Sequence, residues 1–484
     1  MLRSASSLSA PPARKANGAA LSAIAPQFLL VNNSALPYSE NNGALWAGRG
    51  WSTRTLTGFQ VNAGAVRLIF APELIASSNS DWLLFHDFYV PSLPPGRSPF
   101  DLPYYVGNYT IDQPMRFGDK RIRRFDLGQS TLMLSGSRAA FGFSNENEWW
   151  GPGIRNAIIL SNNAPGFPHL FLRTARPLHT RLGDVEARWL VGGLRESDYF
   201  DTIPGNNVRS LAVAGLTLQT GWDPNLTLGF GRAVYATASG WSQVWSRWFD
   251  ILAETSRTDS TASHPSGVRR DHFYSFFGRW VFPNDGVEVY AEWARRFFPE
   301  SLRQLLIAPN HSQGYTLGLQ WRGPDLAGGN LRIQSEITQL EESATFRDEP
   351  VGSWYVSRRV IQGYTNRGEV IGAFIGPGAS SQSLAADYVR PGWRAGVTAT
   401  RIRWNQDVHN HSNLPVYVGY CSEDVTISPG IRGAANGGWG TLTADLSFQN
   451  RLTPFFQNGG GCPNNGRRLD IRNKSLSLTF VPFR

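Results

Sequence analysis

The chain has 484 residues, a net charge of +9 and an aromatic complement of 28 Phe, 17 Trp and 15 Tyr. No apolar run approaches the roughly 20 residues that a membrane-spanning helix needs, which excludes a helical membrane protein. The positive charge comes almost entirely from arginines dispersed along the chain, whereas nucleic-acid binding proteins gather basic residues in one patch, so we expect no nucleic-acid partner.

Segments of about 9 to 12 residues with alternating apolar and polar side chains recur along the chain, joined by connectors that are short and long in turn. The first strands are predicted near 26–33, 50–60, 64–75, 128–136 and 138–145. Later hairpin turns, rich in Gly, Pro, Asn and Asp, are predicted at 181–184, 221–225, 283–286, 323–329, 390–392 and 433–438. The last strand is predicted at 475–483.

The alternation within these segments is regular. In 315–322 the apolar side chains are Tyr315, Leu317, Leu319 and Trp321, and in 441–449 they are Leu442, Ala444, Leu446 and Phe448. About seventeen strands follow from the turns, and the one at 26–33 gives the even number expected of a bacterial outer-membrane barrel. The sequence therefore predicts an all-β fold, a transmembrane antiparallel barrel of about 18 strands with long extracellular loops.

Two connectors are expected to carry structure of their own. One holds Trp241, Val244, Trp245, Trp248, Phe249 and Leu252 at helical spacing, which favours a short amphipathic helix, either packed or presenting an aromatic face for binding. The other, 342–381, contains a strand-like stretch at 369–376, but counting it as a membrane span would reverse every later strand. We therefore predict a single insertion that folds into or over the lumen and obstructs it.

The two cysteines, Cys421 and Cys462, fall in long connectors that flank one hairpin. The sequence allows two alternatives, a disulfide between these cysteines or two free thiols. Neither cysteine belongs to a CxxC pair, so no zinc site is expected.

The first 25 residues contain Arg3, Arg14 and Lys15 but no apolar stretch typical of a secretion signal. We predict that 1–25 is a flexible N-terminal extension and that 26–484 is the barrel.

Catalytic motifs are weak or missing, since the chain has no GxSxG, HExxH or Walker sequence. Glu146 and Glu148 are too close together to argue for acid–base chemistry, and Asp407 with His409 and His411 lacks a fourth metal ligand. We expect neither an enzyme nor a cofactor or metal.

Aromatic residues beside polar ones in the long connectors suggest a carbohydrate site, because aromatic rings stack on sugar C–H faces. Asn, Asp, His and Arg can bind sugar hydroxyls and any uronate carboxylates. Barrel rims also carry aromatic girdles, so each position has a structural alternative. The predicted ligand-binding residues are Trp149, Trp150, Trp404, Asn405, Asp407, His409, Phe455 and Phe456.

The segment 145–169, NENEWWGPGIRNAIILSNNAPGFPH, resembles the capsule assembly protein Wzi family. The likeness continues through GALWAGRG (43–50), VEVYAEWA (287–294), QGYTNRGEVIGAFIGPG (362–378) and RIRWNQD (401–407), and so covers about residues 26 to 484. The family carries a signal peptide and a periplasmic helical region for which we expect no counterpart in 1–25, so either the sequence starts downstream of them or loops alone close the lumen. The WWGPG and GPG segments are then alternatively plug elements rather than sugar contacts.

The resemblance implies an eighteen-stranded barrel in the cell outer membrane, with an obstructed lumen, that holds capsular polysaccharide without catalysis or a cofactor. We therefore expect it to bind and organise capsular or other exopolysaccharide at the cell surface, with outer-membrane lipid and lipopolysaccharide as neighbours and the monomer as the favoured state. The alternative is a porin or diffusion channel, because an eighteen-stranded barrel is wide enough for a pore unless it is plugged.

Overall fold

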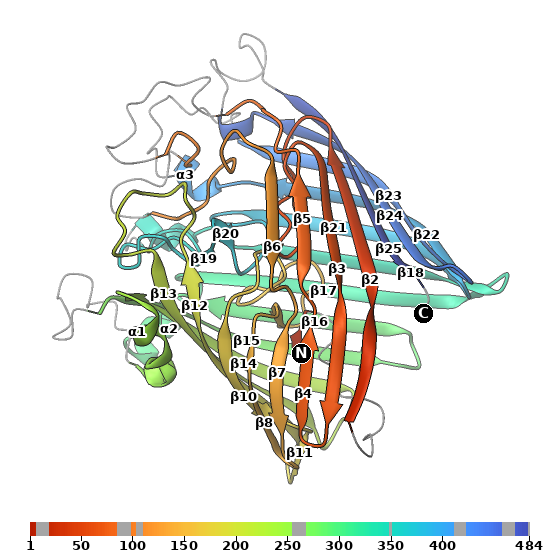
Figure 1. Cartoon of the computed structure of the whole chain (residues 1–484), viewed down its shortest axis with the longest axis horizontal. Helices are drawn as coiled ribbons and strands as arrows, with labels where there is room; N and C mark the ends of the chain where they lie inside the picture. The colour runs from red at the N-terminus through yellow and green to blue at the C-terminus, as the bar shows by residue number, and fades with distance from the viewer. Residues whose placement is uncertain are drawn as a thin grey trace.

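The computed structural model describes residues 1–5, 19–84, 98–102, 110–253, 268–347, 351–410, 423–456 and 470–482, and these form one closed antiparallel barrel (Figure 1). Three of its strands are each divided in two. β4 and β5, which both pair with β3, make one strand, and β6 and β7, which pair with β5 and β4, make the next. β10 and β11, which both pair with β12, make the third. Counted in this way, the described residues contribute eighteen strands, as predicted.

The barrel strands follow in chain order. They are β2 (Ala19–Asn33), β3 (Gly50–Ala63), β4 (Val66–Phe70), β5 (Glu73–Ser77), β6 (Ile122–Asp126), β7 (Thr131–Ser135), β8 (Ala139–Ser144), β10 (His169–Thr174), β11 (Leu178–Thr180), β12 (Gly183–Arg195), β13 (Val208–Thr220), β14 (Leu226–Ala238), β15 (Arg270–Phe282), β16 (Val287–Arg295), β17 (Gln313–Leu326), β18 (Gly329–Gln339), β21 (Ser380–Arg390), β22 (Trp393–Arg403), β23 (Val425–Gly437), β24 (Gly440–Leu452) and β25 (Ile471–Pro482). The ring closes where β25 pairs with β2.

The remaining elements lie in the connectors or, for β1, ahead of the first barrel strand. They are β1 (Leu2–Ser4), β9 (Glu148–Trp150), β19 (Thr365–Asn366), β20 (Glu369–Val370), α1 (Trp241–Trp245), α2 (Leu302–Ile307), α3 (Gln406–Asn410) and the 3-10 helices Trp248–Leu252, Ala344–Arg347 and Pro454–Phe456. The predicted amphipathic helix is therefore present as two short helical pieces, α1 and Trp248–Leu252. Within the described ranges, no helix has both the length and the hydropathy to cross a membrane.

Short turns gather at one end of the barrel and long connectors at the other, and we call these the turn end and the loop end (Figure 1). Every predicted hairpin turn joins two barrel strands. Gly64 and Gly392 have φ angles of 58° and 86° in two of these turns, a left-handed backbone that glycine adopts without steric cost.

The two faces of each strand have different surroundings. Leu190 and Val213, opposite each other on β12 and β13, belong to the large interior cluster, while the next pair, Val191 and Ala212, belongs to a small cluster on the outer face. Elsewhere on the outer face, apolar side chains such as Leu216 and Phe276 are exposed. An apolar outer face that alternates with inward side chains is the pattern of a transmembrane barrel.

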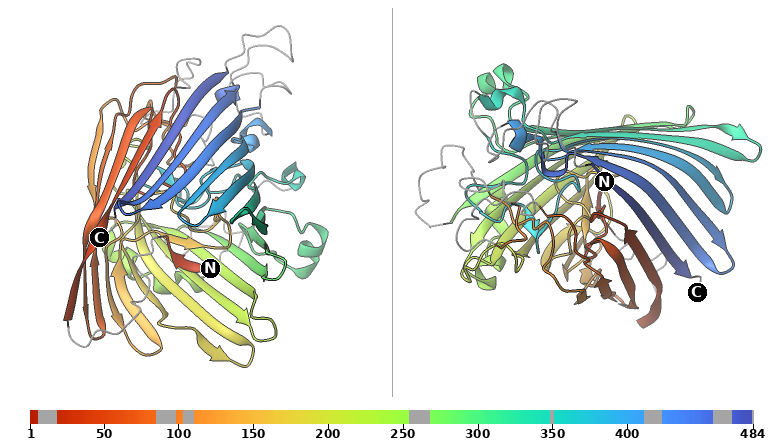
Figure 2. Two further views of the ribbon diagram at one scale, coloured as in Figure 1. Left: turned by 90° about the vertical axis from the view of Figure 1, so that its right-hand side faces the viewer. Right: turned by 90° about the horizontal axis from the view of Figure 1, so that it is seen from above.

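Two connectors pack inside the wall; we call 145–168 the first inner segment and 351–379 the second. They bind each other, since the Tyr355 hydroxyl donates to the Ile158 carbonyl at 2.8 Å and the Tyr364 hydroxyl donates to the Ile159 carbonyl at 3.0 Å. The ring of Trp354 stacks on Phe273 of β15 with centroids 5.2 Å apart. The predicted insertion at 342–381 thus lies between β18 and β21, and its described residues include the 3-10 helix Ala344–Arg347 and the small hairpin β19–β20 (Figure 2).

The N-terminal boundary differs from the prediction. The first barrel strand begins at Ala19 rather than near Pro26, because the Ala- and Ser-rich stretch before Pro26 pairs with β3 across a bulge. Residues 2–4, predicted to be part of a flexible extension, form β1, which pairs with β9 in the first inner segment. Both segments are held by main-chain hydrogen bonds to a neighbouring strand, and a stretch whose side chains alternate only weakly gives no sign of such pairing in the sequence.

Candidate functional site

A cavity of about 200 Å³ opens at the loop end of the barrel, where wall, loops and inner segments meet; we call it the rim cavity. Both inner segments contribute, through Asn163 and through Gly368–Val370 with Phe374. The other lining residues are Leu36, Pro37, Tyr38, Ser39, Trp46, Trp82, Leu102, Gln113, Pro114, Met115, Trp404, Asn405, Thr426, Gln449, Arg451 and Phe455.

The side of the cavity formed by β22, β23 and β24 is held by a network around Arg451. Its guanidinium binds Asp424 through two hydrogen bonds of 2.8 and 2.6 Å and lies over the rings of Phe455 and Trp404, 4.9 and 5.7 Å from their centroids. Trp404 donates from Nε1 to Thr426 Oγ1 at 2.8 Å. These contacts fix the orientation of both rings, so the aromatic surface is formed before any ligand arrives.

A further ring extends this aromatic surface. Trp82 stacks on Phe455 with centroids 5.8 Å apart and an interplanar angle of 29°. Phe455 is held in place by its own backbone N–H, which donates to Asp424 at 2.8 Å, and it adopts a positive φ of 56°. The chain thus turns Phe455 toward the cavity at the cost of an unusual backbone conformation.

Glu369 supplies the acidic group of the cavity. Burial raises the pKa of this carboxyl to about 8, and the positive charge of Arg124 lowers it only in part. At neutral pH the carboxyl is therefore mostly protonated and can donate a hydrogen bond. Amide and hydroxyl groups from Asn405, Gln113 and Thr426 add further polar atoms.

The charge balance of the cavity is close to neutral. Arg451 is the one arginine among its lining residues, and Asp424 neutralises it, while Glu369 is held mostly uncharged. Flat apolar rings with a few polar groups at their edges suit a ligand that has both an apolar face and hydroxyls.

Three of the predicted ligand-binding residues, Trp404, Asn405 and Phe455, line the rim cavity. Two others lie behind it: Phe456 is buried, and His409 packs against its ring with centroids 5.8 Å apart. Asp407 is fully buried in α3 and accepts a hydrogen bond of 2.8 Å from the backbone of Glu342. Burial, with the charge of Glu342, raises the pKa of Asp407 to about 8. Asp407 is thus placed to hold the loop rather than to meet a ligand.

Trp149 and Trp150 are placed away from the rim cavity, in the first inner segment. Trp150 is 1% exposed and donates from Nε1 to the Glu148 carboxylate at 2.9 Å, while Arg188 binds the same carboxylate at 2.6 Å. Trp149 donates to the Gly153 carbonyl at 3.0 Å. Burial removes both indoles from the site that we consider for a ligand, which agrees with the alternative in which WWGPG is a packing element.

The predicted disulfide and His411 lie outside the described residues. Within the described part of the chain, no group of three or more His, Cys, Asp or Glu side chains is arranged to hold a metal ion.

The sequence reasoning missed Trp82, Trp46, Tyr38 and Phe374. All four are aromatic residues in connectors, as the predicted ones are, so the available signal was the same. What distinguishes them is convergence from connectors far apart in the chain, which only the barrel topology brings about.

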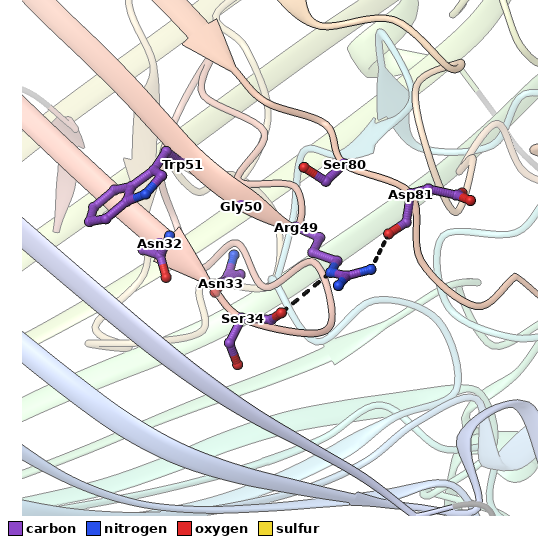
Figure 3. Close-up of a pocket in the computed structure, with 8 residues that line it drawn as sticks. All are labelled: Asn32, Asn33, Ser34, Arg49, Gly50, Trp51, Ser80 and Asp81. Carbon is purple, nitrogen blue, oxygen red and sulfur yellow. Dashed lines mark hydrogen bonds between the residues drawn. The ribbon is translucent and has the colours of Figure 1, made fainter.

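A second hollow, of about 430 Å³, lies at the outer ends of β2 and β3 (Figure 3). Arg49 crosses it and donates from Nε to the Ser34 carbonyl at 3.3 Å and from Nη1 to the Asp81 carbonyl at 2.5 Å. Its one aromatic side chain, Trp51, is turned away from the guanidinium (Figure 3). Without converging rings, this hollow is less suited than the rim cavity to a sugar.

Comparison with solved structures supports the fold. The Wzi protein of Escherichia coli, described as an outer-membrane protein involved in group 1 capsule assembly and a carbohydrate-binding β-barrel, has a TM-score of 0.56 and 11% identity, with 95% of this chain and 84% of that chain covered. The outer-membrane channel DcaP of Acinetobacter baumannii has a TM-score of 0.37 and 8% identity, covering 97% of this chain and 99% of that chain, too distant for any argument. OccAB3 of the same organism has a TM-score of 0.41 and 10% identity, covering 94% and 98%, and is equally uninformative.

Sequence comparison identifies the family. No curated protein is significantly similar in sequence to this chain. The model of the capsule assembly protein Wzi family, however, matches residues 52–389, well over half of the chain. The chain therefore belongs to the capsule assembly protein Wzi family and is a β-barrel of the cell outer membrane.

Proposed function

We propose that this barrel binds capsular or another surface polysaccharide in the rim cavity and helps to attach and organise it at the cell surface. The observation that carries the proposal is the convergence of Trp404, Phe455 and Trp82 with polar groups at the loop end. Membership of a capsule assembly family and the carbohydrate binding of the Escherichia coli protein support the same assignment. The proposal gives the cavity a role in binding rather than in catalysis.

In this mechanism a sugar ring lies with its C–H face on the aromatic surface, and its hydroxyls bind Asn405, Gln113 and the protonated Glu369. The sequence suggests that arginines pair with uronate carboxylates, but Asp424 neutralises the one arginine among the lining residues of the cavity. An uncharged sugar unit is therefore the better ligand, because a buried uronate would meet no unpaired cation among the lining residues. Weak contacts repeated along one polymer give useful avidity.

We further propose that the inner segments obstruct the lumen, so that the protein is not a diffusion channel. Support comes from the hydrogen bonds that hold the two segments together and to the wall, for example from Arg209 Nη1 to the Gly363 carbonyl at 3.0 Å. A channel would require these segments to leave the lumen. Single-channel conductance in planar bilayers distinguishes the two functions.

The decisive experiment is calorimetric titration of the detergent-refolded barrel with surface polysaccharide from its own organism, with an unrelated neutral glycan as control. We expect saturable binding to the native polymer only. Trp404→Ala should weaken it by about tenfold, since stacking of one ring contributes on the order of 1 kcal/mol and the polar contacts next to it loosen.

Trp439→Ala is the matched control, because Trp439 is an exposed indole at the turn end, between β23 and β24. It should leave binding unchanged. No binding by a folded wild-type barrel would overturn the proposed function and favour the channel. Equal effects of the two substitutions would place the ligand elsewhere.

A further inference from the structure

Arginines collect on the outer face of the barrel near the loop end, on three adjacent strands. Arg232 of β14 lies opposite Tyr274 of β15, and Tyr274 lies opposite Arg295 of β16. Two residues further toward the turn end on the same face, Phe230 lies opposite Phe276, which is exposed in the apolar belt. We call the set Arg232, Arg270 and Arg295 the outer arginine patch.

The connector after β14 folds back over this patch. Arg232 donates to the Ile251 and Ala253 carbonyls at 2.6 and 2.7 Å, and Ile251 packs on Val191 and Val234 of the wall. The connector after β16 does the same, with the ring of Phe298 stacked on Tyr274 at 4.3 Å. The patch is therefore built into the outer face and is not a group of freely moving surface side chains.

Acidic side chains balance only part of this charge. Asp250 pairs with Arg270 at 3.0 Å and with Arg247 at 3.6 Å. Arg295 is 2% exposed and lies at 6.0 Å from the ring of Trp293, yet no acceptor among the described residues binds its Nε or Nη1. A buried guanidinium whose Nε and Nη1 donors are unused is costly unless an anion takes them up.

Around the patch, the same connectors present apolar side chains outward. Phe249 and Leu252 of the 3-10 helix are 69% and 71% exposed. In α2, which lies at the loop end in Figure 1, the exposed apolar residues are Leu302, Leu306 and Ile307. Apolar side chains beside cations, continuous with the lipid-facing belt, are the arrangement of a membrane-interface surface.

We propose that the outer arginine patch and the apolar side chains beside it form a docking site for the phosphorylated glycolipid of the outer leaflet. Its phosphate would accept hydrogen bonds from Nε and Nη1 of Arg295 once the side chains that cover this guanidinium shift, and its acyl chains would pack against Phe249 and Leu252. Charge complementarity and continuity with the apolar belt favour this ligand over a soluble protein. The site is separate from the rim cavity and does not depend on polysaccharide binding.

The test is a titration of the refolded barrel in detergent with lipid A carrying both phosphates, compared with dephosphorylated lipid A and phosphatidylglycerol. We expect lipid A with phosphates to bind most tightly. Arg295→Gln should weaken this binding about tenfold, the loss expected for a charge-assisted hydrogen bond, and should barely change binding of the dephosphorylated lipid. The double substitution Phe249→Ser with Leu252→Ser should weaken binding of both.

Arg123→Gln is the matched control, since Arg123 is an exposed arginine of β6 on the face that carries the exposed Phe125. It should have no effect. Equal loss in Arg123→Gln and Arg295→Gln, or equal affinity for all three lipids, would overturn the proposal. If Arg295→Gln does not fold, as judged by heat-modifiable gel mobility, Arg295→Lys and the apolar double substitution test the site in its place.

Discussion

Glu336 offers the sharpest test of how the first inner segment is held in the lumen. This carboxylate faces inward from β18 and accepts main-chain N–H groups from Ile154 at 2.6 Å, Arg155 at 3.1 Å and Asn156 at 2.9 Å. It also accepts the Tyr290 hydroxyl at 2.8 Å. One wall side chain thus binds three consecutive residues of the segment, as an anion binds a nest of backbone N–H groups.

Glu336→Gln keeps the size of the side chain but leaves it a single acceptor oxygen and no charge. Whichever oxygen becomes the amide nitrogen, at least one main-chain N–H loses its acceptor. A hydrogen bond to a charged group contributes about 1.5–3 kcal/mol, and the remaining bonds weaken with the loss of charge. We therefore expect local opening of 154–156 to become easier by about 2–4 kcal/mol, or roughly 30-fold to 1,000-fold in the opening equilibrium.

Hydrogen exchange with mass spectrometry on the refolded barrel measures this change, because amide exchange follows local opening. Peptides covering 150–160 should exchange faster in Glu336→Gln by that factor, while wall peptides keep their wild-type rates. Glu288→Gln is the control, since Glu288 also faces inward but binds Arg279 and Gln320 of the wall. Unchanged exchange at 154–156 would refute the anchoring role of Glu336.

Two further predictions concern packing and pH. In Gly318→Ala, the added methyl carbon would lie 1.9 Å from Cζ of Tyr290, so the ring must move and the barrel should lose about 1–3 kcal/mol, read as a lower melting temperature. The control is Gly278→Ala, whose nearest contact would be 3.5 Å, and an equal loss in both would contradict the packing argument. For Glu369, the pKa of about 8 places the loss of its donating proton near that pH, so polysaccharide binding should weaken as pH rises through about 8. Glu369→Gln should bind with little pH dependence, and a parallel pH profile in both proteins would remove Glu369 from the site.

The strands and turns were predictable because their signals are local. A period of two residues and a glycine in a left-handed turn are visible in any short window, as at Gly64 and Gly392. The start of the first strand was missed because Ala and Ser alternate too weakly before Pro26 to mark a lipid-facing side. Main-chain pairing with β3, which placed that start at Ala19, leaves no trace in the side chains.

The roles of the aromatic residues were only partly predictable. Trp150 and Trp404 both stand beside polar residues in connectors, yet one is buried against Glu148 and the other lines the rim cavity. Their sequence surroundings are alike, and the difference arises from contacts across the barrel. Asn156, six residues after Trp150, is bound by Glu336, which is 180 residues further along the sequence than Asn156. A single sequence carries no record of such a contact, so packing elements and ligand contacts look the same.

The inner segments connect the two proposed roles, which are polysaccharide binding in the rim cavity and obstruction of the lumen. Asn163 belongs to the first segment, Glu369 and Phe374 belong to the second, and all three line the rim cavity. The Asn163 side chain donates to the Val370 carbonyl at 2.9 Å, so the two segments are joined at the cavity itself. If the segments obstruct the lumen as proposed, a movement that opened it would therefore also dismantle one side of the proposed sugar site. Loosening the first segment through Glu336→Gln should then raise conductance and weaken polysaccharide binding together, whereas Trp404→Ala should weaken binding alone.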